Sequence, residues 1–204
     1  MDDRDFDDLY GRFASLDPRG AAQLLKGFPR PWWIGGGWAI EMFTDVSRSH
    51  EDLDICISST DVSGVVTHFA DSHHVWAVGS GSLKPLIRPD DPLPDWAGQL
   101  WIRENAHKPW LLDFLLCPVA DGVWRFKRDI SITLPFEEAT WVAENGIRYE
   151  RPEVSLLYKA KHDRPKDRAD FDVTLPLLDT DAVEWLERAL QKAHPGHTWL
   201  ERLG

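Results

Sequence analysis

Two carboxylates one residue apart, Asp52 and Asp54, have the residue type and the spacing that a metal site needs. In an extended strand, alternate side chains share a face and each residue advances about 3.3 Å, so the two carboxylates point the same way from Cα atoms about 6.6 Å apart. Mg²⁺ prefers oxygen ligands, usually one or two carboxylates together with phosphate oxygens of a substrate. The pair therefore predicts a magnesium site at a strand.

The apolar neighbours of this pair separate it from the other acidic residues. With 34 Asp and Glu among 204 residues, some aspartate pairs with this spacing occur by chance. The acidic cluster from Asp2 to Asp8 contains such pairs but no apolar alternation. Leu53 and Ile55 alternate with the pair and predict a core face. Ionised carboxylates beside a buried strand lose hydration and repel each other unless a cation compensates them. Zinc is disfavoured for two reasons. His50 is the one nitrogen ligand on the strand face that carries Asp52 and Asp54, and the sequence has no zinc-binding spacing of His or Cys.

A third acid, Asp113, lies in the most apolar stretch of the chain, residues 110–116. A lone carboxylate there is costly without a function. Neighbouring strands lie about 4.8 Å apart, so Asp113 on an adjacent strand is expected to face the first pair as metal ligand, general base, or both. The alternative is a buried aspartate that bonds to backbone or to an arginine.

Three consecutive glycines, Gly35, Gly36 and Gly37, precede a helix expected at residues 37–44. Glycine permits positive φ and close approach of a ligand, and the free N–H groups at a helix start attract anions such as phosphate. A flexible turn is the alternative interpretation of the run.

Taken together, these motifs resemble the ordered motifs of a known enzyme superfamily. The sequence GGGWAIE at residues 35–41, the RxHxDxD pattern from Arg48 to Asp54, and LLDFLL around Asp113 are similar to the motifs of the DNA polymerase β-type nucleotidyltransferases. Within that superfamily they most resemble the aminoglycoside 2″-O-adenylyltransferases and related small antibiotic nucleotidyltransferases. The match is close over residues 31–57, holds for Asp113 by position, and elsewhere follows the general order of elements.

The resemblance implies an α/β (α+β) fold with a short mixed β-sheet flanked by helices, and Mg²⁺-dependent transfer of AMP from ATP with release of pyrophosphate. It assigns Asp52 and Asp54 to metal binding and Asp113 to metal binding and to deprotonation of the acceptor. The expected nucleotide-binding residues near the turn are Gly35, Gly36, Gly37, Arg48 and His50. The role of Glu41 stays open, because the family commonly has Asp there. Arg48 either neutralises phosphate or pairs with Glu51.

Downstream, basic residues concentrate between residues 159 and 168 in an otherwise acidic chain. A solvated face with acidic partners is one interpretation. This region also resembles the start of the helical C-terminal part of small nucleotidyltransferases, where a lysine contacts the triphosphate. On that basis Lys159, and after it Lys166, are the candidates to neutralise the leaving pyrophosphate.

The sequence predicts a nucleotidyltransferase core at residues 1–150 and a C-terminal helical subdomain at 151–204, with a hairpin at 141–149 before the boundary. Expected strands lie at 75–78, 82–88, 99–103 and 110–116, and expected helices at 5–15, 20–27, 37–44 and 61–70. A last helix is expected from a cap at Asp179 or Thr180 to His194. His194 and His197 are expected to be surface histidines, and Cys56 and Cys117 to be reduced core thiols.

The formal net charge of −11 argues against general nucleic-acid binding and favours a cationic acceptor. The absence of a signal peptide or a span-length apolar segment predicts a cytoplasmic protein without membrane association. We therefore predict an ATP- and Mg²⁺-dependent adenylyltransferase acting on an aminoglycoside or similar cationic small molecule. The alternatives are a toxin-type nucleotidyltransferase that modifies tRNA or a protein hydroxyl, and a catalytically silent nucleotide-binding protein. The oligomeric state is left undetermined.

Overall fold

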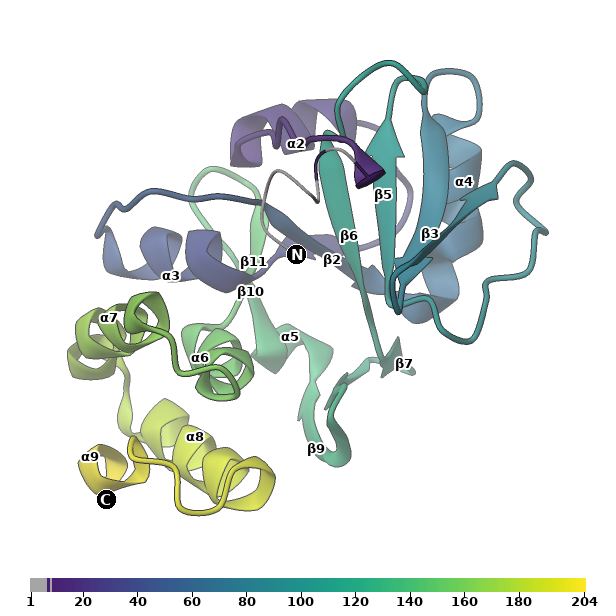
Figure 1. The fold of residues 1–204 in the computed structure, drawn as a ribbon. Helices are drawn as coiled ribbons and strands as arrows, with labels where there is room; N and C mark the ends of the chain where they lie inside the picture. Colours follow the sequence, from purple (N-terminus) through teal and green to yellow (C-terminus); the bar gives the residue numbers. More distant parts are fainter. Residues whose placement is uncertain (1–6, 8) are drawn as a thin grey trace. The chain divides into compact units, whose positions relative to one another are not determined.

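The computed structural model describes residue 7 and residues 9–204 as two compact units (Figure 1). The first unit comprises Met1–Trp32 and Glu51–Cys117, and the second comprises Trp33–His50 and Pro118–Gly204. Each unit is described by itself below.

The first unit is built on strands in the order β2 (Asp54–Ser58), β6 (Leu112–Cys117), β5 (Gln99–Arg103), β3 (His74–Gly79) and β4 (Ser82–Leu86). The strands β2 and β6 are parallel, whereas the later neighbours pair antiparallel. Ile55, Ile57, Leu100 and Phe114 are fully buried in this sheet. The strands expected from residue 75 onwards are confirmed, with bounds that differ by a few residues.

Helices α2 (Pro18–Leu24) and α4 (Val62–Phe69) belong to the same unit, and a short 3-10 turn (Ser59–Asp61) precedes α4. Asp17 caps α2 by accepting a hydrogen bond from the backbone N–H of Gly20 at 2.7 Å. The buried residues of α4 recur at helical spacing and face the core: Val62, Val65, Val66 and Phe69.

The helix expected at 5–15 is wrong for residues 11–15, while residues 5, 6 and 8 lie outside the described part of the chain. Gly11 has a φ of +85°, and Phe13 forms an isolated parallel bridge with Trp110. The backbone N–H of Ala14 donates to the carbonyl of Trp110 at 2.8 Å. Strand-like pairing has replaced the helix because the aromatic side chain of Phe13 packs on the cluster of Val78, Trp101 and Trp110.

The second unit contains β1 (Trp32–Ile34), β11 (Arg148–Glu150) and β10 (Thr140–Val142). Ile34 of β1 pairs in parallel with Tyr149 of β11, and β10 and β11 form the antiparallel hairpin that the Asn145-Gly146 turn predicts. A separate antiparallel sheet of β7 (Val119–Ala120), β8 (Val123–Phe126) and β9 (Asp129–Pro135) leads into the short helix α5 (Phe136–Ala139). This second sheet was not predicted.

The helices of the second unit are α3 (Gly36–Thr44), α6 (Pro152–Ala160), α7 (Pro165–Thr174), α8 (Thr180–Ala193) and α9 (Leu200–Leu203), with a 3-10 turn at Leu175–Leu177. Proline stands in the first turn of both α6 and α7, where its missing N–H costs nothing. Asp179 caps α8 through a 2.8 Å bond from the N–H of Ala182, as predicted. Mixed strand pairing with flanking helices confirms the predicted α/β class. The division at residue 150 stays a prediction.

Cys56 and Cys117 are buried and are not joined in a disulfide, as expected. None of the helices in the described part of the chain combines the length and the apolar character that crossing a bilayer requires.

Candidate functional site

The first unit holds the predicted carboxylates. Asp54, the first residue of β2, is the Cα partner of Asp113 on the parallel strand β6. Residues in parallel register share a face of the sheet, with Cα atoms about 4.8 Å apart. Both side chains are half-buried. The prediction that Asp113 lies beside Asp54 on an adjacent strand is therefore confirmed.

Gln99 on β5 orients Asp113. Its Nε2 donates a hydrogen bond to Oδ2 of Asp113 at 2.8 Å. A neutral amide donor fixes the carboxylate without cancelling its charge, whereas the alternative interpretation proposed an arginine partner. The hydrogen bond from Gln99 itself therefore places no opposite charge beside Asp113.

The position of Asp52 differs from the predicted position on the strand. Asp52 is exposed and precedes β2, which begins at Asp54, so the alternation of a strand does not fix its direction. No three His, Cys, Asp or Glu side chains among the described residues are grouped as ligands of one metal ion. Asp54 and Asp113 nevertheless offer the oxygen donors that Mg²⁺ takes when substrate phosphates complete its shell. The metal-binding role of Asp52 remains a prediction.

The second unit holds the glycine turn. Gly35 is the N-cap of α3 in an extended conformation, Gly36 has a φ of +62°, and the helix begins one residue earlier than expected. The N-cap residue Gly35 has no side chain with which to cap the first turn of α3. The N–H groups of that turn point outward from the helix start, where the helix dipole favours an anion.

Gly37 is required by close packing. A Cβ atom at this position would lie 2.1 Å from Nη2 of Arg48 and 3.0 Å from Nδ1 of His50. Both side chains therefore lie directly against the helix start. The structure brings together the predicted nucleotide-binding residues Gly35, Gly36, Gly37, Arg48 and His50.

Glu41, whose role was open, holds this segment in place. Its Oε2 bonds to Nε2 of His50 at 2.7 Å and accepts the backbone N–H of Arg48 at 3.2 Å. Trp38 stacks on the other side of the His50 ring, with centroids 4.0 Å apart. Burial works to raise the pKa of Glu41, but the hydrogen bonds from His50 and Arg48 outweigh it and hold that pKa below its ordinary value. Glu41 is thus an ionised anchor for residues 48–50.

Arg48 and Lys159 share a buried carboxylate. Nε and Nη2 of Arg48 donate to the two oxygens of Asp170 at 2.9 and 3.1 Å, and Nζ of Lys159 lies 2.8 Å from Oδ2 of the same residue. Asp170 is 3% exposed and Lys159 is 8% exposed. Arg48 therefore pairs with Asp170 on α7, a partner that neither of the two alternatives from the sequence, phosphate or Glu51, included.

Asp167 extends this network. Its carboxylate binds Arg164 through both oxygens, at 2.8 and 3.1 Å, and lies 3.7 Å from Nζ of Lys159. Burial works to raise the pKa of Asp167, but the bonds from Arg164 and the charge of Lys159 lower it below its ordinary value. Sequence reasoning missed both aspartates, although their three-residue spacing on one helix face was a visible signal. Lys166 is half-buried, and its role stays a prediction.

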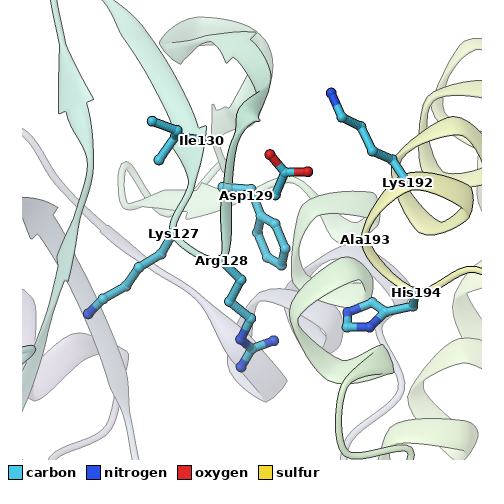
Figure 2. A pocket seen from close by; sticks show the side chains of 8 residues that line it. Lys127, Arg128, Asp129, Ile130, Lys192, Ala193 and His194 are labelled. Atoms are coloured by element: carbon cyan, nitrogen blue, oxygen red, sulfur yellow. The ribbon is translucent and has the colours of Figure 1, made fainter.

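A basic pocket of about 420 Å³ lies elsewhere in the second unit. Figure 2 shows the side chains that line it, from the β8–β9 hairpin and the end of α8. The cationic residues among them are Lys127, Arg128 and Lys192. His194 also lines it, and both His194 and His197 are partly exposed, which is compatible with the expectation that they are surface histidines. His197 bonds to the carbonyl of Ala160 at 3.0 Å.

Comparisons with known proteins agree with the motifs. The family model described as aminoglycoside-2''-adenylyltransferase matches residues 20–78. No curated protein matches the sequence. The solution structure of the antibiotic-resistance factor ANT(2'')-Ia is 17% identical, with a TM-score of 0.54, over 85% of this chain and 89% of that one. The lincomycin-bound crystal structure of the lincosamide antibiotic adenylyltransferase LnuA is 16% identical, with a TM-score of 0.49, over 76% of this chain and 92% of that one.

The likeness to ANT(2'')-Ia shows a shared fold, and the matched family segment contains the glycine turn and the Asp52–Asp54 motif. The chain is therefore similar to antibiotic nucleotidyltransferases in the sequence of residues 20–78 and in its fold. Within that class, the matched segment is that of the aminoglycoside 2''-adenylyltransferases, which confirms the resemblance seen in the sequence.

Proposed function

We propose that this chain transfers AMP from ATP to a hydroxyl group of an aminoglycoside or a similar cationic small molecule. The observation that carries the proposal is the register of Asp54 and Asp113, two carboxylates on adjacent parallel strands. Their oxygen atoms suit Mg²⁺, and Asp52 is the proposed additional ligand. When bound, Mg²⁺ neutralises phosphate oxygens and favours ionisation of the attacking hydroxyl.

In this proposal Asp113 accepts the proton of the acceptor hydroxyl as the oxygen attacks the α-phosphorus of ATP. The hydrogen bond from Gln99 holds the second oxygen of Asp113 in a fixed direction, so the carboxylate is oriented before the substrate arrives. The oxygen–phosphorus bond to the acceptor forms while the bond to pyrophosphate breaks.

The proposed binding groups for the triphosphate come from the second unit. Glycines 35–37 supply backbone N–H groups at the start of α3, and Arg48, His50 and Lys159 supply cationic or hydrogen-bonding groups fixed by Glu41 and Asp170. These groups stabilise the charge that develops on the leaving pyrophosphate. Lys166 is the second proposed lysine contact.

The acceptor class rests on charge and on the family. The net charge of −11 favours a polycation, and the family model that matches residues 20–78 is named for aminoglycoside adenylylation. We therefore propose a cationic antibiotic as the acceptor.

The test incubates the protein with Mg²⁺, ATP labelled at the α-phosphorus, and a panel of aminoglycosides and lincosamides. The expected result is label on an aminoglycoside. Label on tRNA or protein in a lysate, with none on the panel, would instead support the toxin-type alternative. Binding of ATP with Mg²⁺ and no transfer to any acceptor would support the silent nucleotide-binding alternative.

A further inference from the structure

The basic pocket is independent of the groups assigned to adenylyl transfer. It lies between the β8–β9 hairpin and the C-terminal end of α8, and its lining residues share no member with the glycine turn or the carboxylate pair. Lys127, Arg128 and Lys192 contribute three positive charges, and Asp129 contributes one negative charge. The pocket is thus cationic in a chain whose net charge is −11.

Two of the lining side chains extend toward the same part of this pocket. Figure 2 shows Arg128 and His194 extending toward the same space, whereas Lys127 and Lys192 point elsewhere. Nη1 of Arg128 donates to the carbonyl of Tyr158 at 2.9 Å, and the guanidinium lies 5.5 Å from the centroid of the Tyr158 ring. A guanidinium carries five N–H donors, so donors remain after that bond. The bond to Tyr158 therefore holds Arg128 in place and leaves further N–H groups of the guanidinium to bind a ligand.

His194 has an unused ring nitrogen. Its Nε2 is buried and has no hydrogen-bond partner within the described residues. His194 also lines the pocket, so an anion held by Arg128 would lie beside its imidazole.

The charged groups around His194 come from each neighbouring segment: Arg128, Lys127 and Asp129 from the hairpin, Lys192 from α8, and Lys161 and His197 from the segments after α6 and α8. Burial lowers the pKa of His194, and the charges of Arg128, His197 and Lys161 lower it further. Oδ1 of the Asp129 carboxylate accepts a hydrogen bond from the backbone N–H of Ser131 at 3.0 Å, within the same hairpin. Burial and the surrounding positive charges therefore both disfavour the protonated form of His194.

We propose that this pocket binds a small phosphate-class oxyanion between Arg128 and His194, and that His194 takes up a proton when the anion binds. The oxyanion accepts hydrogen bonds from the guanidinium and from the protonated imidazole. Lys127 and Lys192 add attraction at longer range, and Asp129 opposes it. The bound negative charge reverses the repulsion that lowers the pKa of His194, so binding and protonation reinforce each other.

The sign of the pH dependence follows from this coupling. At low pH His194 is already protonated and the anion binds to a pocket with one more positive charge. As pH rises, the proton must be supplied on binding, so affinity falls. Sulfate is the suitable probe because its own charge is constant between pH 5 and pH 8.

The first experiment measures sulfate and pyrophosphate binding by calorimetry, with buffers of different ionisation enthalpy to count protons. The wild-type protein is expected to bind sulfate about tenfold more tightly at pH 6 than at pH 8, because binding is coupled to protonation of His194. His194→Gln is expected to lose this pH dependence. The control His107→Gln, at an exposed histidine of the first unit, is expected to behave as wild type.

The second experiment locates the anion, because pyrophosphate would also bind the triphosphate groups of the proposed function. Histidine labelled at the ring carbons reports each imidazole separately by NMR. Sulfate is expected to raise the pKa of His194 and to leave that of His107 unchanged. A His194 resonance that does not respond to sulfate or pyrophosphate would overturn the proposal, even in wild-type protein, and would leave the adenylyl-transfer proposal intact.

Discussion

Asp54 and Asp113 are Cα partners on two parallel strands, and their side chains therefore occupy one face of the sheet in the first unit. Two like charges at this separation repel each other, and the amide of Gln99 at 2.8 Å from Asp113 orients the second carboxylate without adding charge. A bound cation would remove the repulsion. This relationship is the reason that transfer activity is expected to depend on both aspartates.

Asp113→Asn is expected to reduce adenylyl transfer by about 10²–10⁴-fold, because the amide neither accepts the hydroxyl proton nor carries charge. Stability is expected to stay the same or to rise, since the repulsion with Asp54 disappears. The measurement is the initial rate with α-labelled ATP, beside a thermal melt. Asp71→Asn, an exposed aspartate of the same unit, is the control. Undiminished transfer by Asp113→Asn would remove Asp113 from the mechanism.

Gly37→Ala is expected to destabilise the protein by about 1–3 kcal/mol and to weaken ATP binding. The added Cβ would lie 2.1 Å from Nη2 of Arg48, which is held by two bonds to Asp170 and has little freedom to withdraw. Denaturant unfolding and ATP titration measure the two effects.

Gly64→Ala is the matched control for this glycine substitution. Its Cβ would make ordinary contact at 3.6 Å with Arg30 and Phe28, and alanine inside helix α4 is expected to stabilise by about 0.5–1 kcal/mol. If Gly37→Ala bound ATP as well as wild type, close approach at the helix start would not matter for nucleotide binding.

Asp170→Asn is expected to destabilise the protein by about 3 kcal/mol, because it leaves Arg48 and the buried Lys159 without their shared negative charge. Asp172→Asn, two residues along α7, breaks an exposed ion pair with Arg202 and is expected to cost at most about 1 kcal/mol. Urea unfolding of the two variants compares a buried pair with an exposed one on the same helix. Equal losses would show that the Arg48–Asp170–Lys159 network contributes no more than a surface pair.

The sequence predicted the groups that carry local signals. Asp113 was identified because a carboxylate in an apolar stretch requires an explanation, and the start of α3 because glycines precede a helical pattern. The position of Asp52 was predicted less well. Alternation of apolar and polar residues identifies a strand but does not locate its first residue, and β2 begins at Asp54.

Most of the missed features depend on tertiary contacts. The pairing of Arg48 with Asp170 joins residues 122 positions apart in the sequence, which no spacing rule connects. The β7–β8 hairpin did carry a local signal, since Asp121 and Gly122 have φ values of 53° and 73° and Asp-Gly favours this kind of turn. Phe13 was assigned to a helix because its packing against Trp110 is not visible in the local pattern.

Glu153, at the start of α6, is expected to make stability depend on pH. It is 6% exposed, and its Oε2 is buried without a hydrogen-bond partner among the described residues. Burial raises its pKa, and the negative charge of Asp179 adds to this, while its own backbone N–H and the charge of Arg151 oppose it incompletely. A raised pKa means that the folded state favours the neutral carboxyl. The stability that Glu153 contributes to the folded protein is therefore fully present below the ordinary pKa of glutamate. It is lost as pH rises through the raised pKa that Glu153 has in the folded state.

Glu153→Gln keeps the neutral form at every pH, so it is expected to be more stable than wild type at pH 7, by about 1–2 kcal/mol, and equal to it near pH 4. Glu201→Gln, at an exposed position on α9, is the control and is expected to change stability little at either pH. The measurement is urea unfolding of the three proteins across that pH range. A loss of stability in Glu153→Gln at pH 7 would mean that the folded protein stabilises the ionised carboxylate, which would reverse the sign of the pKa shift.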